Sequence, residues 1–191
     1  MVAVAVGALA LGACGGGERQ DKDEPSGTFD LRITDASFPG KQTLAQKSTM
    51  KIAVRNADTK DVPNIAVTVA ADPGDSGGAP QAFAQDIADT NVSDPSRPVW
   101  IVDMPPKGGS TAYTNTWALG ELKAGETKTF EWKVTAVKAG KYTIDYSASP
   151  GLTGKAKPAG DTRGSFDVVI DDRPPTATVN DKGEVVRQPA D

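Results

Sequence analysis

The chain has 191 residues, of which 38% are hydrophobic and 24% are charged, and its net charge is −4. This length suits one domain with tails, and a net negative chain without a basic run excludes nucleic acid as a partner. The sequence contains no histidine, which excludes histidine acid–base catalysis, Ser-His-Asp and Cys-His nucleophiles, and blue-copper sites.

The first 14 residues, MVAVAVGALALGAC, are small and apolar. Such a run is shorter than a membrane-spanning helix of roughly 20 residues, but it matches the apolar core of a secretory signal, about 7–15 residues long. We interpret residues 1–13 as a signal segment. No Lys or Arg precedes the run, so we expect the translation start to lie upstream of Met1, with a truncated sequence as the alternative.

The residues Leu11-Gly12-Ala13-Cys14 resemble the lipobox of bacterial lipoproteins, in which an aliphatic residue and two small residues precede a cysteine. The resemblance implies that Cys14 is diacylated, becomes the first mature residue and anchors the chain to the cell membrane on its extracytoplasmic side. Two or three acyl chains hold a protein firmly, because each buried CH₂ contributes about 0.8 kcal/mol. Residues 14–27 continue with polar residues and glycine, and we expect them to form a disordered tether.

From Thr28 onward, apolar residues alternate with polar ones, which is typical of half-buried strands. The alternating segments are 29–33, 50–54, 65–69, 130–134, 142–146 and 166–170. Helical periodicity is weak, although residues 81–90, with Phe83 and Ile87 four apart, have the spacing for one or two helical turns. Short strands with one apolar face each predict an all-β fold over residues 28–171, with two packed antiparallel sheets.

Three segments, 51–70, 119–135 and 139–149, resemble the immunoglobulin-like domains of CARDB and DUF11 type in bacterial surface proteins. The resemblance implies an immunoglobulin-like sandwich. We expect structural roles for its motif residues: Asn56 opening a turn through its side chain, Gly125 supplying a positive φ, and Tyr142 forming a tyrosine corner. Ala124 and Asp58 depart from the pattern, where proline and glycine are usual.

Residues 71–118 form an insertion far longer than an ordinary connection, and such insertions are functional or disordered. We expect its second half to be ordered, with one strand at 99–102 and another carrying Tyr113, Trp117 and Leu119. Three aromatic residues are candidate ligand-binding residues for a sugar ring or a partner loop: Trp100, Tyr113 and Trp117. The alternative is that they pack the core of the sandwich.

Loop aspartates in and beside this insertion provide hard oxygen atoms of the kind that calcium prefers. They are Asp72, Asp75, Asp86, Asp89 and Asp94. Their spacing matches no EF-hand, and the alternative is that water solvates them, so we predict no metal and no cofactor. In the tail, residues 172–191, Asn180-Asp181-Lys182-Gly183 predicts a hairpin turn, with a loosely ordered terminus as the alternative.

The sequence thus predicts a non-enzymatic, membrane-anchored extracytoplasmic module that binds an envelope protein or a cell-wall glycan. One alternative is a structural spacer of the cell envelope without a specific ligand. A less favoured one is a carbohydrate-active enzyme, which requires two carboxylates about 5–10 Å apart in a cleft. No spacing in the sequence points to such a pair.

Overall fold

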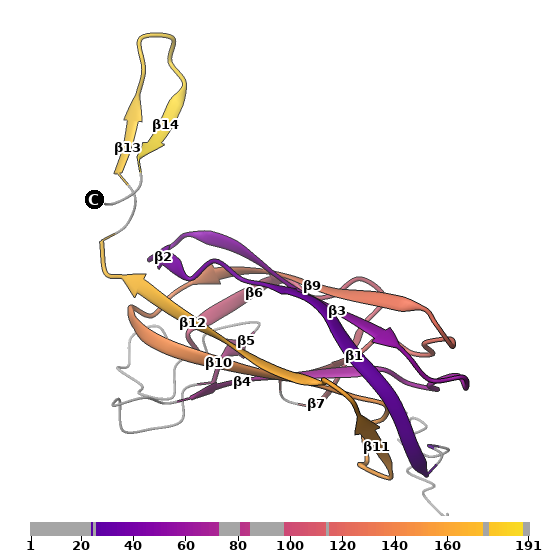
Figure 1. Cartoon of the computed structure of the whole chain (residues 1–191). Coiled ribbons are helices and arrows are strands. Elements are labelled where there is room, and N and C mark those ends of the chain that lie inside the picture. Colours follow the sequence, from indigo (N-terminus) through magenta and orange to yellow (C-terminus); the bar gives the residue numbers. More distant parts are fainter. Residues whose placement is uncertain are drawn as a thin grey trace, which may run out of the picture.

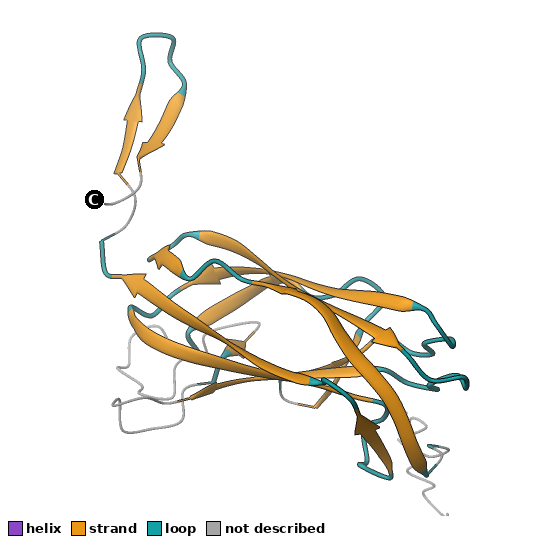
Figure 2. Cartoon of the chain, viewed as in Figure 1, coloured by secondary structure: helices purple, strands orange, loops and turns teal. Residues whose placement is uncertain are grey.

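The computed structural model describes residue 24 and residues 26–72, 81–84, 98–113, 115–173 and 176–188. In this part of the chain every regular element is a strand (Figure 2). The strands are β1 (Gly27–Ser37), β2 (Lys41–Thr43), β3 (Lys47–Asn56), β4 (Ala66–Asp72), β5 (Phe83–Ala84), β6 (Trp100–Met104), β7 (Ser110–Tyr113), β8 (Thr116–Ala118), β9 (Thr127–Ala136), β10 (Gly140–Ser149), β11 (Ala156–Ala159), β12 (Arg163–Asp171), β13 (Thr176–Val179) and β14 (Val185–Gln188).

Twelve of these strands form two six-stranded sheets that pack face to face (Figure 1). Their strand orders are β11-β1-β3-β9-β6-β5 and β2-β12-β10-β4-β8-β7. In the centre of each sheet all pairs are antiparallel, as expected, but β11, β5 and β2 pair in parallel with their neighbours. The sheets are therefore mixed. A tight hairpin turn forces two strands to be antiparallel. A strand that is joined to its neighbour by a longer connection can pair in either direction.

The strand order is that of an immunoglobulin-like β-sandwich. Strands β1, β3 and β9 take the places of A, B and E in one sheet, and β4, β10 and β12 take those of C, F and G in the other. The predicted fold class is confirmed, with β6 and β8 from the insertion extending the two sheets beside β9 and β4.

The core lies between the sheets and follows the alternation in the sequence. On β3, Met50, Ile52 and Val54 are fully buried, whereas Lys51 and Arg55 between and after them are exposed. The largest fully buried side chains are Trp100, Trp132, Phe83, Phe130, Leu31, Met50, Ile52, Ile65 and Leu122. Burial of this apolar surface stabilises the sandwich by about 25 cal/mol per Å².

The insertion contributes four short strands, of which β6 confirms the strand predicted at 99–102. Tyr113 and Trp117 were expected on one strand, but they lie on two, because the chain reverses at Asn115, whose φ is 62°. The spacing of residues 81–90 is compatible with one or two helical turns, but the structure places Phe83 in β5, paired with Trp100 of β6. Residues 85–90 lie outside the described part of the chain. Residues 83 and 84 form hydrogen bonds with the edge strand β6. A single helical turn is unstable, because its first hydrogen bond requires several residues to be ordered.

The two ends of the sandwich differ in the segments that meet there. Leu31 pairs with Asn56, Arg55 with Thr127, and Ser149 with Ala66. The start of β1 and the loops 57–65, 119–126 and 150–155 therefore share one end, which we call the Asn56 end. The opposite end, which we call the β2 end, holds β2, the start of β10 and the finish of β12.

The C-terminal tail forms the predicted hairpin, with β13 and β14 paired in a sheet of their own (Figure 1). The Asn180 side chain accepts hydrogen bonds from the backbone N–H groups of Lys182 and Glu184, at 3.0 and 2.9 Å. Gly183 has a φ of 78°, a conformation that glycine adopts without steric cost. The turn is thus closed by its own residues.

Candidate functional site

The tryptophans predicted as ligand-binding residues lie in the core. Trp100 is 0% exposed and Trp117 is 5% exposed, and both rings pack edge-on against Phe83, with centroids 6.0 and 5.9 Å apart. Neither ring offers a free face on which a sugar can stack, so these two residues do not form the expected platform. Tyr113 lies on β7, and its side chain is outside the described part of the structure.

Trp100 instead connects the two sheets. Its indole N–H donates to Oε1 of Gln42, at 2.8 Å, although Trp100 belongs to one sheet and Gln42 to β2 of the other. Gln42 is 3% exposed, and its own amide donates to the carbonyl of Pro39, at 2.9 Å. This hydrogen bond could not be predicted from the sequence, because the two residues are far apart along the chain.

Most of the calcium candidates and the lipidation candidate fall outside the described residues. These are Cys14, Asp75, Asp86, Asp89 and Asp94, and for Asp72, at the end of β4, only the backbone is described. Among the residues that the structure describes, no three or more acidic, histidine or cysteine side chains are grouped closely enough to hold a metal ion. No described helix has the length and apolar character needed to cross a membrane.

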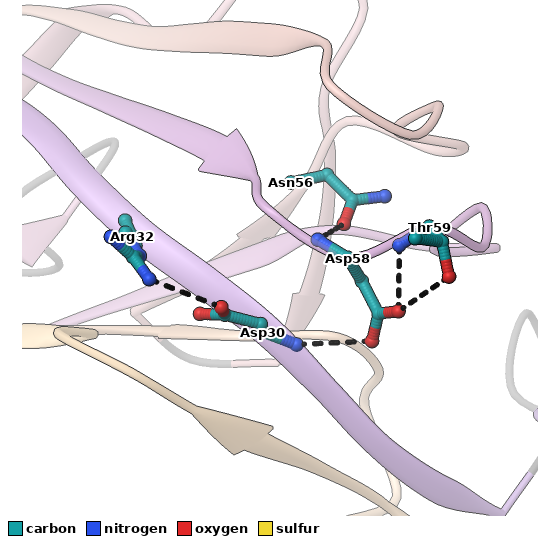
Figure 3. A network of polar contacts seen from close by, with 5 residues as sticks. All are labelled: Asp30, Arg32, Asn56, Asp58 and Thr59. Atoms are coloured by element: carbon teal, nitrogen blue, oxygen red, sulfur yellow. Dashed lines mark hydrogen bonds and ion pairs between the residues drawn. The ribbon is translucent and has the colours of Figure 1, made fainter.

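Asn56 organises the polar network at its end of the sandwich (Figure 3). Its side chain is fully buried and makes three hydrogen bonds. The amide donates to the carbonyls of Lys60, at 2.9 Å, and Leu122, at 3.0 Å, while Oδ1 accepts from the N–H of Asp58, at 3.0 Å. The predicted role of Asn56 in opening the turn is confirmed, and the same amide joins the loop to residue 122.

Asp58 continues this network toward β1 (Figure 3). Its carboxylate accepts hydrogen bonds from the N–H groups of Thr59, at 2.7 Å, and Asp30, at 3.3 Å. Burial alone would raise the pKa of Asp58, but these N–H donors and the charge of Lys60 outweigh it and lower the pKa below its usual value. The resembled families usually have glycine at this position, which has no carboxylate. In this chain the carboxylate of Asp58 attaches the loop to β1.

A second set of contacts fixes loop 119–126 beside the Asn56 turn. Asp61 accepts a hydrogen bond from the N–H of Ala124, at 2.8 Å, and Lys128 donates to the carbonyls of Leu119 and Glu121. Gly125 has a φ of 75°, as predicted for this turn. The two loops therefore form one ordered surface, on which the side chains of Glu121 and Lys123 are exposed.

Tyr142, at the start of β10, forms the predicted tyrosine corner. Its hydroxyl donates to the carbonyl of Ala139, three residues upstream, at 2.9 Å. Burial raises the pKa of Tyr142, because the ionised phenolate would lose its hydration in the core. This residue has the structural role expected of it.

Glu24 lies in the segment 14–27, for which the sequence predicts a disordered tether, and its role was not predicted. The structure places its side chain against the loop after β10, only 8% exposed. The Glu24 carboxylate accepts hydrogen bonds from the backbone N–H groups of Leu152 and Thr153. The polar composition of the segment concealed this contact, because the donors are backbone groups more than a hundred residues away.

No family model and no curated protein matches this sequence. Among solved structures, the chain is similar to the CARDB domain of the PF1109 protein from Pyrococcus furiosus, crystallised with di-metal ions, at 15% identity and a TM-score of 0.47. That match covers 76% of this chain and 96% of the other. A second similar structure is native Escherichia coli alpha-2-macroglobulin, at 14% identity and a TM-score of 0.42, covering 74% of this chain and 7% of that one. The assignment of the fold rests on the two packed sheets.

Proposed function

We propose that the chain is a non-enzymatic immunoglobulin-like module that is held outside the cytoplasm by lipid on Cys14 and binds a protein of the cell envelope. The lipid is supported by the sequence Leu11-Gly12-Ala13-Cys14 at the end of an apolar run. A protein partner is favoured over a cell-wall glycan, because the buried rings of Trp100 and Trp117 have no free face for a sugar.

The observation that carries the binding proposal is the ordered polar surface at the Asn56 end. The side chain of Asn56 donates to backbone carbonyls, and the carboxylates of Asp58 and Asp61 accept hydrogen bonds from backbone N–H groups. These bonds hold the two loops in place. A surface that is already ordered loses little conformational entropy when a partner binds. Its exposed charges of both signs, such as Glu121 and Lys123, provide the electrostatic complementarity that selects one partner over others.

A charge swap on this surface tests the proposal with the full-length chain. Glu121→Lys with Lys123→Glu reverses two exposed charges and leaves the net charge unchanged. Lys141→Glu with Asp145→Lys is the matched control, since both residues are exposed on β10. We expect detergent-solubilised envelopes to yield the same partner with wild type and control, and about tenfold less with the loop swap, equivalent to about 1.4 kcal/mol. Equal recovery with both swaps would place binding elsewhere.

A structural spacer without a specific ligand is the second candidate. The observation that favours it is the burial of Trp100 and Trp117, which removes two of the three candidate contact residues from the surface. The same capture experiment separates the two functions. A spacer recovers neither a protein nor a glycan, whether or not the loop charges are swapped.

A further inference from the structure

The loop that follows β10 surrounds the carboxylate of Glu24 with hydrogen-bond donors. One carboxylate oxygen accepts from the N–H of Leu152, and the other accepts from the N–H of Thr153, at 2.8 Å, and from its hydroxyl, at 2.6 Å. Two consecutive backbone N–H groups that point at one anion form the kind of nest that binds carboxylates and phosphates. Glu24 is more than nine-tenths buried there.

The loop is built to leave space for this group. A Cβ added at Gly151 would lie 2.8 Å from the Cδ and Oε2 atoms of Glu24 and 3.0 Å from its Oε1. These are the three nearest atoms, so the carboxylate occupies the space that a side chain at residue 151 would take. The loop is also held from within, because the hydroxyl of Ser149 donates to the carbonyl of Gly151, at 2.8 Å.

We propose that residues 149–154 form a carboxylate-binding site, and that Glu24 of the same chain fills it. The contact attaches Glu24 to the sandwich at the Asn56 end. Without the Glu24 side chain, the site accepts a small carboxylate from solution. This inference concerns the domain itself and holds whether or not Cys14 carries a lipid.

A double-mutant cycle between Glu24→Ala and Gly151→Ala tests whether the two positions share one site. In the wild-type background, Gly151→Ala places a methyl group against the carboxylate and lowers the urea midpoint of unfolding. In the Glu24→Ala background the same change meets no carboxylate, and we expect it to leave the midpoint unchanged or to raise it. If Gly151→Ala lowers the midpoint equally in both backgrounds, the proposed site is wrong.

Hydrogen exchange with acetate as the probe tests for the ligand class. We expect the amides of Leu152 and Thr153 to exchange about tenfold faster or more in Glu24→Ala than in wild type, because each loses a charged acceptor. Sodium acetate should slow them again, sodium chloride at the same ionic strength should not, and Glu24→Ala with Gly151→Ala should respond to neither. Unchanged exchange in Glu24→Ala, or identical effects of the two salts, would refute a carboxylate site.

Discussion

Asn56 joins three parts of the chain through one buried amide. Its side chain contacts the backbone of Asp58 and Lys60 in its own loop, and of Leu122 in the loop that precedes β9. Burying an amide costs free energy unless its donors and acceptor are all paired. With three hydrogen bonds made, the amide fixes the loop instead of destabilising it.

Replacement of Asn56 by alanine should therefore destabilise the whole domain. The change leaves the buried carbonyl of Leu122 without this donor, and we expect the free energy of unfolding to fall by about 2–4 kcal/mol in urea titrations. Asn64→Ala is the control, since Asn64 accepts one exposed hydrogen bond, from Gly120 at 3.2 Å, and should cost less than about 1 kcal/mol. Equal costs at the two positions would contradict the assigned role.

The lowered pKa of Asp58 predicts a dependence of stability on acid. A carboxyl group whose pKa is lower in the folded than in the unfolded chain stabilises the fold above its unfolded value, about 3.9. That contribution is lost as the pH falls through the folded pKa. Wild type should be more stable than Asp58→Asn at neutral pH, and the difference should shrink below about pH 4. A difference that is the same at both pH values would show that Asp58 does not act through its charge.

Among the elements, β2 is a strand of three residues that depends on the facing sheet. Gln42 of β2 accepts the indole N–H of Trp100, so Gln42→Ala leaves a buried donor unpaired. We expect a loss of about 1–3 kcal/mol by urea unfolding. In a Trp100→Phe background no such donor remains, and the same change should cost less. A cost that does not depend on residue 100 would mean that the hydrogen bond contributes nothing.

The alternation of apolar residues identified the central strands from the sequence, because a half-buried strand imposes a period of two. For Met50, Ile52 and Val54 the period alone indicated the buried face. Alternation does not predict structure that depends on residues distant in the sequence. Strand β5 forms by pairing with β6, and Glu24 is held by the N–H groups of Leu152 and Thr153. Local composition carries no information about either partner.

Trp100 and Trp117 show the same limit for the candidate site. Trp100 lies between Val99 and Ile101, and Trp117 alternates with Leu119. Both patterns are compatible with a core position and with an exposed platform. Both rings pack on Phe83, and this contact places the two tryptophans in the core. The ordered loops of the Asn56 end depend on hydrogen bonds between residues 56–61 and 122–124, which no periodicity encodes.

At the scale of the whole molecule, the N-terminal segment joins the sandwich at the Asn56 end, where β1 begins (Figure 1). Residues 15–23 reach at most about 30 Å when fully extended. A ten-residue strand such as β9 adds roughly 30 Å more toward the β2 end. A chain anchored at Cys14 should therefore hold the Asn56 end nearer to the membrane.

Energy transfer from the protein to labelled lipids tests this orientation. Cys14 is the only cysteine, so Lys123→Cys and Lys41→Cys each introduce one free thiol once Cys14 is acylated. Lys123 lies at the Asn56 end and Lys41 at the β2 end, and both are exposed. We expect a dye at position 123 to transfer energy to a headgroup acceptor more efficiently than a dye at position 41. Equal efficiencies would contradict a fixed orientation of the anchored sandwich.

The lipid on Cys14 is the claim on which the position of the protein outside the cytoplasm depends. Metabolic labelling with palmitate, in cells that express the full chain or its Cys14→Ser variant, tests it most directly. We predict that wild type carries label and remains in the membrane fraction at high salt, and that Cys14→Ser carries none. Equal labelling of the two chains would show that Cys14 is not the anchor.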